Sequence, residues 1–499
     1  MMNFEIEIST FHHSSFIIFM VRVRFAPSPT GFVHVGSLRT ALYCYLYAQH
    51  NGGVNILRIE DTDRTRYVEG AVENMLSTMA WAGITFDEGP VQGGEFGPYV
   101  QSERTDIYRS HSNRLIESGN AYPCFCTAER LDMVRKAQQA SGQPPMYDRL
   151  CRNLTKEETD RRIAAGEPHV IRMRVPIGEI VRFNDMIRGD IEFDSRTIDD
   201  QVLMKSDGFP TYHLANIVDD HLMEITHVIR GEEWLSSTPK HVLLYQALSW
   251  EPPKFAHLPL LLNADKSKLS KRQGDVAVED YKDKGYLPQA LINFVALMGW
   301  NPSATEEIFS IDDLIRDFNL ERVNKGGAVF NREKLDWMNS EYIRKMTPTE
   351  LLPLVKPLIA TRNYVVSDDY LLSVIKLMQE RVRTLWDFVD FASYFYVAPT
   401  DPEHYDEKYK AKHWTPQAKE HLTNLLPQFQ ALDNWDHDSL EAVVRQYAEA
   451  NGLGAGKLIH PIRLAVTGKG MGPGLFELLA VIGKAESIKR MDQAIHSLV

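Results

Sequence analysis

Two short segments contain residues suited to holding a nucleotide. Pro27–Ser37 includes His34 and Gly36 just where a helical pattern begins. The N-terminus of a helix carries unpaired N–H groups and a positive partial charge, so phosphate binds there readily. Lys268–Arg272 is a basic segment whose lysines could stabilise charge on a phosphate in a transition state. Taken singly, each segment is better explained without chemistry, the first as a Pro/Gly turn with an incidental histidine and the second as a basic surface loop.

Cysteines form a second group of residues with chemical potential. Cys124, Cys126 and Cys151 lie within a stretch of 28 residues, and the chain has four cysteines in all. Zinc takes four ligands, usually cysteine and histidine. A structural metal site is therefore one interpretation, and reduced thiols without metal are the other. So few cysteines argue against a secreted fold built on disulfides.

The elements around the first segment form a compact pattern. Residues 21–26 and 54–59 read as strands, and apolar spacing predicts a helix over 37–49 that stops at Gly52-Gly53. This order predicts a parallel βαβ unit with a right-handed crossover. The loop at Pro27 then lies at the carboxyl end of the first strand, where open α/β sheets bind ligands.

Later segments predict an interrupted sheet followed by helices. An Arg-rich, cysteine-bearing stretch at about 106–205 precedes Gly208–Asp220 and the strand-like Ile225–Arg230, which return to the sheet. Beyond residue 340 the pattern is helical. Thr347–Glu350 is a capping box, and apolar residues at steps of four and three predict an amphipathic helix over 367–390.

Bulk composition limits the class of protein. A chain of 499 residues with 44% apolar and 24% charged residues is long enough for several packed domains. No apolar run is long enough to span a membrane, and Phe16–Met20 follows acidic residues and fails as a signal peptide. Residues 1–19 are thus an extension, or the true start is Met20. We expect a soluble, cytoplasmic protein.

Net charge alone is a poor guide to the partner. The value of −12 counts mildly against a nucleic acid. The charge that matters is local, however, and basic residues cluster within 161–188 and 266–272. Solvated surface faces are the alternative explanation of both clusters.

The run Arg24–Ala41 resembles the opening of glutamyl-tRNA synthetases almost residue for residue. Together with Lys268–Arg272, it forms a pair similar to the two nucleotide-binding signatures of class I aminoacyl-tRNA synthetases. Ser37 stands where many class I enzymes carry a second histidine, and glutamyl enzymes commonly have a small residue there. The resemblance extends from about Val21 to the carboxyl terminus, densely up to residue 340 and more thinly after it.

This resemblance implies an α/β Rossmann-type catalytic domain with an inserted α+β acceptor-binding domain, followed by an all-α anticodon-binding region. The expected boundaries are an N-terminal extension at 1–19, the first half of the catalytic domain at 20–105, an inserted acceptor-stem-binding domain with a candidate zinc site at 106–205, the second catalytic half at 206–262, a stem-contact domain with the lysine loop at 263–342, and helical anticodon-binding domains at 343–499.

The resemblance also implies functional residues. The expected catalytic residues are His34, Gly36, Lys268 and Lys271. The expected ATP-binding residues are Thr30, His34, Gly36, Glu233, Trp234 and Lys271. The expected glutamate-binding residues are Arg24, Ala26, Ser28, Glu60, Tyr212, Asn216 and Arg230.

Charge suggests how the amino acid would be held. Because arginine suits bidentate recognition of carboxylates, Arg24 and Arg230 are candidates for the γ-carboxylate, and Tyr212 adds a hydroxyl. Glu60 would face the α-ammonium. The alternative for the charged run Arg58–Arg64 is a strand end closed by local salt bridges.

Two further sites are implied with less direct matches. Some glutamyl synthetases bind zinc through Cys-x-Cys and Cys-x-His, but Asn153 stands where that histidine would be. A variant with Tyr four residues before the last Cys fits Tyr147. The implied ligands, which would staple the insertion, are Cys124, Cys126, Tyr147 and Cys151. Arg381, on the helix predicted over 367–390, is the candidate for reading the anticodon, and an ordinary exposed arginine is the alternative.

The implied activity is ATP- and Mg²⁺-dependent activation of L-glutamate to glutamyl-adenylate, followed by transfer to the 3′-terminal adenosine of tRNA(Glu). The family implies that tRNA binds before activation, and we expect a monomer with no membrane partner. One alternative is a non-discriminating enzyme that also glutamylates tRNA(Gln). A stand-alone enzyme acting on a modified tRNA base would lack the helical half. A non-catalytic paralogue is disfavoured by His34, Lys271 and Arg230.

Overall fold

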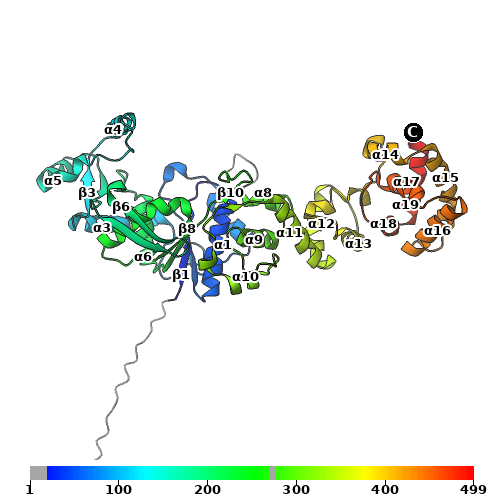
Figure 1. Cartoon of the computed structure of the whole chain (residues 1–499), viewed down its shortest axis with the longest axis horizontal. Coiled ribbons are helices and arrows are strands. Elements are labelled where there is room, and N and C mark those ends of the chain that lie inside the picture. The colour runs from blue at the N-terminus through cyan, green and yellow to red at the C-terminus, as the bar shows by residue number, and fades with distance from the viewer. Residues whose placement is uncertain (1–19, 270–275, 499) are drawn as a thin grey trace, which may run out of the picture. The chain divides into compact units, whose positions relative to one another are not determined.

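The structure, a computed structural model, describes residues 20–269 and 276–498. The chain divides into two compact units, one within Met1–Leu269 and Ala296–Val329 and the other within Ser270–Val295 and Phe330–Val499. All named strands belong to the first unit (Figure 1).

The βαβ unit predicted near the start is confirmed. β1 (Arg22–Phe25) and β2 (Val54–Leu57) pair in parallel, and α1 (Val35–His50) connects them. The apolar positions of α1 are buried, as expected of a crossover helix packed on a sheet. The loop after β1 therefore opens at the carboxyl edge of the sheet.

The second part of the sheet places three strand ends side by side. Its order is β6-β5-β9-β8, with β8 (His227–Gly231) and β9 (Lys254–Leu258) parallel. Thr226, just before β8, exchanges hydrogen bonds with Arg22 of β1: the Thr226 N–H donates over 2.9 Å, and its hydroxyl accepts over 2.8 Å. The carboxyl ends of β1, β8 and β9 consequently meet at one edge.

An insertion separates the two parts of the sheet. Its antiparallel sheet consists of β3 (Ala121–Cys124), β4 (Val170–Met173) and β7 (Val202–Met204). The next hairpin, β5 (Ile180–Asp185) and β6 (Gly189–Asp194), pairs with β9. This hairpin lies within the range expected for the inserted domain, yet it extends the catalytic sheet. The six expected domain boundaries stay a prediction.

The first unit also contains further helices and two short strands. They are α2 (Ala71–Trp81), α3 (Thr105–Glu117), α4 (Ala128–Ala140), α5 (Lys156–Ala164), α6 (Tyr212–Leu222), α7 (Thr238–Ala247), β10 (Leu261–Leu262), α10 (Ile311–Asp317) and β11 (Ala328–Val329). The helix α9 (Pro288–Ala296) lies at the division between the units.

The second unit is helical. Residues 330–498, all of which the structure describes, include no strand. The helices of this unit are α8 (Val278–Asp283), α11 (Arg332–Lys345), α12 (Pro348–Thr361), α13 (Asp368–Met378), α14 (Glu407–His413), α15 (Pro416–Ala431), α16 (His437–Ala450), α17 (Gly456–Thr467), α18 (Leu475–Ile482) and α19 (Lys484–Ser497). The predicted capping box is confirmed, because Thr347 and Glu350 each accept from the other's backbone N–H.

The helix predicted over 367–390 is wrong in its second half. α13 begins after the cap Ser367 and ends at Met378, and a 3₁₀ turn follows at Leu385–Phe388. Asp387 accepts from the backbone N–H groups of Arg383 and Thr384 over 2.7 and 3.0 Å, which holds the chain in a turn. Leu385 stays buried in the turn, so the apolar spacing persists although the helix does not.

Among the described residues, no helix combines the length and the apolar composition needed to cross a bilayer.

Candidate active site

A cleft of about 500 Å³ opens in the first unit at the carboxyl edge of β1 and β8. Every described residue expected to bind ATP or glutamate lines it: Arg24, Ala26, Ser28, Thr30, His34, Gly36, Glu60, Tyr212, Asn216, Arg230, Glu233, Trp234 and Lys268. Lys271 lies outside the described residues. The fold thus brings together segments that are about two hundred positions apart in the sequence.

His34 is the N-cap of α1. Its Nδ1 accepts from the Gly36 N–H over 2.9 Å, so the neutral ring carries its proton on Nε2. A Cβ on Gly36 would lie 3.2 Å from His34 Nδ1, which is closer than an ordinary contact. Glycine therefore lets the imidazole pack against the end of the helix, where Gly36 and Ser37 of the first turn line the cleft.

Arg24, at the end of β1, is held by Asp220. Its Nε and Nη2 donate to the two Asp220 carboxylate oxygens over 2.9 and 3.3 Å, and Arg58 Nη2 lies 2.8 Å from the same carboxylate. Burial alone raises the pKa of Asp220, but the two guanidiniums outweigh it and lower the pKa below the ordinary value. Arg24 is thus largely committed to an internal ion pair.

Glu60 presents a carboxylate with one oxygen occupied. Its Oε1 accepts from Arg58 Nη2 and Asn216 Nδ2, each over 3.0 Å. Burial raises the pKa of Glu60, against the opposing effect of Arg58 and Arg24. Both of these donors, the ones found among the described residues, bind Oε1, and Glu60 lines the cleft. A ligand cation beside Oε2 would favour the ionised form.

Arg230, at the end of β8, differs from its neighbours because its partners are neutral. It is 5% exposed, and it donates to the Tyr212 hydroxyl over 2.9 Å, to the Thr238 hydroxyl over 2.9 Å and to His257 Nε2 over 3.1 Å. His241 Nδ1 lies 3.3 Å from its Nη1. A buried guanidinium is costly without an anion, and no described residue gives Arg230 a carboxylate within salt-bridge distance.

An aromatic wall completes this side of the cleft. The rings of Tyr212 and Trp234 lie 4.4 Å apart and are tilted by 36°. Burial raises the pKa of Tyr212, which keeps it a neutral phenol. Because its oxygen accepts from Arg230, its own O–H remains a donor.

The segment before Lys271 is hydrogen-bonded to β10. The Leu269 N–H donates to the Leu261 carbonyl over 2.9 Å, and Leu262 forms an antiparallel bridge with Lys268. Lys268 thereby lies in the lining of the cleft.

Three residues at or beside the cleft were missed from the sequence. Asp220 and Arg58 support the cleft from behind its lining, because they pair with Arg24 and Glu60. The Asp220–Arg24 pair joins residues 196 positions apart, and no local pattern marks such a pair. Arg39, one turn into α1, lines the cleft itself, and it donates from Nη1 to the Met298 carbonyl over 3.2 Å and from Nη2 to the Pro259 carbonyl. The only signal in the sequence was an arginine among the apolar positions of the predicted helix.

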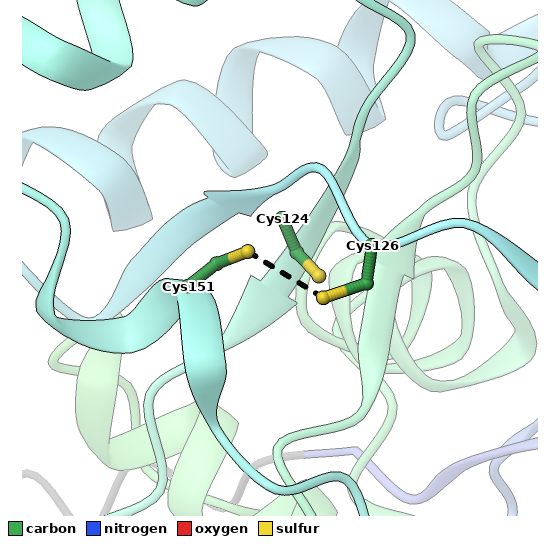
Figure 2. Close-up of side chains that lie close together, drawn as sticks. All are labelled: Cys124, Cys126 and Cys151. Carbon is green, nitrogen blue, oxygen red and sulfur yellow. Dashed lines mark hydrogen bonds between the residues drawn. The ribbon is translucent and has the colours of Figure 1, made fainter. Parts of the chain in front are cut away.

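The cysteines converge in the insertion. Sγ atoms of Cys124, Cys126 and Cys151 lie within 4.8 Å of one another, and Figure 2 shows all three pointing to a common centre. The Cys126 and Cys151 sulfurs are 3.6 Å apart. The Tyr147 oxygen lies 3.3 Å from Cys124 Sγ and 3.4 Å from Cys126 Sγ.

These separations fit a tetrahedral metal site. With Zn–S bonds of about 2.3 Å, tetrahedral geometry puts ligand sulfurs about 3.8 Å apart. The hydrogen bond from Cys151 lowers the pKa of the Cys124 thiol, although burial opposes this, and a lowered pKa favours the thiolate form that binds a metal. The described donor set could therefore hold a zinc ion.

Arg381 lies outside any helix, in the turn after α13, and is exposed. The nearby buried Arg463 of α17 was missed from the sequence. Its Nη2 donates to the Pro473 carbonyl over 2.7 Å, while its Nη1 has no described partner. Burial lowers the pKa of Arg463, and Arg381 contributes in the same direction.

Comparison with known proteins agrees with this architecture. Residues 20–337 match the family described as tRNA synthetases class I (E and Q), catalytic domain, and residues 350–495 match an anticodon binding domain. The glutamate–tRNA ligases of Chloroherpeton thalassium and Chlorobium chlorochromatii are each 50% identical, and each alignment covers 96% of this chain and 98% of the relative.

Solved structures give the same result. A crystal structure of a glutamate tRNA ligase from Elizabethkingia meningosepticum, in complex with its amino acid, superposes with a TM-score of 0.90 at 43% identity, covering 96% of this chain and 100% of that one. The glutamate–tRNA synthetase of Elizabethkingia anophelis gives 0.88 at 42%, with the same coverage. These matches confirm the predicted fold class, and they show that the chain belongs to the glutamate–tRNA ligase family of class I aminoacyl-tRNA synthetases.

Proposed function

We propose that this chain activates L-glutamate with ATP in the cleft and transfers the glutamyl group to tRNA(Glu). The glutamate α-carboxylate attacks the α-phosphate of MgATP in line, giving glutamyl-adenylate and pyrophosphate. The terminal ribose of the tRNA then attacks the activated carbonyl through its 2′-hydroxyl and releases AMP. No protein nucleophile is needed, because positioning and preorganised charge supply the rate.

The observation that carries the proposal is the neutral surroundings of Arg230. Asp220 holds Arg24 at 2.9 Å, and Asp219 holds Arg104 at 2.8 Å, whereas the partners of Arg230 are hydroxyls and imidazoles. Its charge is therefore available to a ligand carboxylate. With the Tyr212 O–H beside it, it would bind the γ-carboxylate, and glutamine would leave this guanidinium without an anion.

A second group of cleft residues supports the orientation of the amino acid. Glu60 would accept from the α-ammonium through Oε2, since Arg58 and Asn216 occupy Oε1. Asn216, Ala26 and Ser28 would line the backbone of the substrate. Arg24 would contribute through the N–H groups that Asp220 does not use.

For ATP, the N-terminus of α1 and the His34 Nε2–H would face the phosphates. Gly36 would let the nucleotide approach the helix, Thr30, Glu233 and Trp234 would contact ATP, and Lys268 would stand at the phosphate side. Lys271, outside the described residues, is assigned to the transition state by family resemblance alone.

The helical unit would read the tRNA. Arg381 stays the predicted anticodon contact. The buried Arg463, whose Nη1 lacks a described partner, is a second candidate. The cluster Cys124, Cys126, Tyr147 and Cys151 would hold one Zn²⁺, which when bound would tie β3 to the segment 147–151 without taking part in the reaction. A monomer acting in the cytoplasm remains the expectation from the sequence.

The decisive experiment is aminoacylation of purified glutamate and glutamine tRNAs with radioactive glutamate, and with glutamine as the competing amino acid. We expect charging of the glutamate tRNA by glutamate alone, and pyrophosphate exchange into ATP only when tRNA is present. Equal charging of both tRNAs would establish the non-discriminating alternative. Absence of charging with either tRNA would refute the proposed enzyme.

A further inference from the structure

We propose that Asp185 and His257 are positioning residues for Arg230. Asp185 holds His257 in a single neutral tautomer, and in that tautomer His257 accepts a hydrogen bond from Arg230. The inference rests on the proposed function, in which Arg230 binds the γ-carboxylate of glutamate. The three residues lie on adjacent strands in the order β5-β9-β8, and Arg230 and His257 are facing partners of the β8–β9 ladder.

The hydrogen bonds leave one tautomer. Arg230 Nε lies 3.1 Å from His257 Nε2, and an arginine Nε always carries its proton, so Nε2 must accept. The Thr238 hydroxyl, also 3.1 Å from Nε2, can only add a second donor there. The imidazole proton is therefore on Nδ1, which lies 2.6 Å from Asp185 Oδ2.

Asp185 is itself fixed by backbone donors. Its Oδ1 accepts from the N–H groups of Ile187 and Arg188 over 3.0 and 2.9 Å. An amide in its place would have to keep its oxygen at these N–H groups. Its NH₂ would then face His257 Nδ1 and drive the ring proton to Nε2, where it would oppose the Arg230 N–H. A carboxylate is thus required to keep Nε2 an acceptor.

A second imidazole supports the guanidinium in the same way. His241 Nδ1 lies 3.3 Å from Arg230 Nη1, and His241 Nε2 lies 3.1 Å from His213 Nδ1. Burial lowers the pKa of both His257 and His241, which keeps the rings uncharged. Neutral acceptors orient the arginine without cancelling its charge, whereas a directly paired carboxylate would compete with the ligand.

The test is the Asp185→Asn variant, with Asp190→Asn as the matched control on the exposed neighbouring strand, where Asp190 accepts from Asn184. In tRNA-dependent pyrophosphate exchange we expect Asp185→Asn to raise KM for glutamate about tenfold, with KM for ATP within about twofold. Asp190→Asn should leave both unchanged. An equal increase in KM for glutamate and in KM for ATP would indicate a merely structural role and would overturn the proposal.

Two measurements separate this inference from the function on which it rests. If Arg230→Ala raises KM for glutamate and Asp185→Asn does not, the positioning role fails while the function stands. If neither variant changes KM for glutamate, the proposed role of Arg230 fails as well. Should Asp185→Asn not fold, nitrogen NMR of ¹⁵N-histidine in the wild-type protein, assigned with His257→Gln, still decides: a proton on Nε2 of His257 would overturn the proposal.

Discussion

Arg230 donates from Nη1 to the Tyr212 hydroxyl over 2.9 Å, and both groups line the cleft. The phenol is half-buried against Trp234, so the guanidinium and the O–H are presented to a ligand from one wall. A carboxylate there would receive two donors of different strength, one of them charged.

Replacing Arg230 with alanine should weaken glutamate binding selectively. We expect KM for glutamate to rise about a hundredfold, equivalent to about 3 kcal/mol for a charge-assisted contact, and KM for ATP to change little. Exchange kinetics with tRNA present measure both. Arg182→Ala, at an exposed position of β5 paired with Glu192, is the control. An unchanged glutamate KM in the Arg230 variant would remove this residue from the pocket.

Glu60→Gln should affect the other end of the amino acid. Losing the carboxylate should raise KM for glutamate by about tenfold. Inhibition by glutarate, which has both carboxylates but no ammonium, should be unaffected in this variant. The same inhibition should be weakened in Arg230→Ala. If Glu60→Gln weakens glutarate as strongly as glutamate, Glu60 does not recognise the ammonium.

Gly36→Ala tests the nucleotide side. The added methyl group would lie 3.2 Å from His34 Nδ1 and must displace the imidazole from the end of α1. We expect kcat to fall about tenfold or more, with KM for glutamate near normal. Gly326→Ala, where a Cβ would have no neighbour within 4 Å, controls for the substitution itself. Similar kinetics in the two variants would argue against a role for this contact.

Zinc binding should depend on the cysteine cluster. Wild-type protein purified without chelator should contain about one zinc per chain, and Cys151→Ser should contain almost none, as measured by mass spectrometry of the metal. Tyr147→Phe should still bind zinc through the three sulfurs, but more weakly, because the fourth ligand is lost. The buried Cys44, which lies outside the cluster, provides the control Cys44→Ser. Metal-free wild-type protein of full thermal stability would contradict a structural zinc.

Stability should fall in mild acid through His227. Burial lowers its pKa to about 4, compared with about 6.5 in an unfolded chain. The unfolded state therefore binds the proton more readily, and stability declines as the pH drops from about 6.5 to about 4. In urea unfolding at pH 7 and pH 5, His227→Phe should lose less stability than wild type. An equal loss of stability in the variant and in the wild type would exclude His227 as the cause.

The sequence was sufficient for elements whose signal is local. The βαβ unit, the capping box at Thr347 and the helical second half could be predicted, because periodicity and caps are properties of neighbouring residues. The predicted helix over 367–390 was wrong, since Asp387 turns the chain while apolar spacing continues. The Asp220–Arg24 pair and the His257–Arg230 contact join separate segments of the chain. No local sequence pattern identifies the partner of any of these residues.

The hydrogen bonds between Arg22 and Thr226 span 204 positions, and they close the gap between β1 and β8. During synthesis on the ribosome, one edge of β1 stays unpaired until the segment that contains Thr226 and β8 has been made. At about 5–20 residues per second, this wait lasts roughly ten to forty seconds. An unpaired strand edge exposed for that long is open to pairing with other nascent chains. We therefore expect the amino-terminal half to engage chaperones during translation, and the pocket to form only after the insertion has emerged.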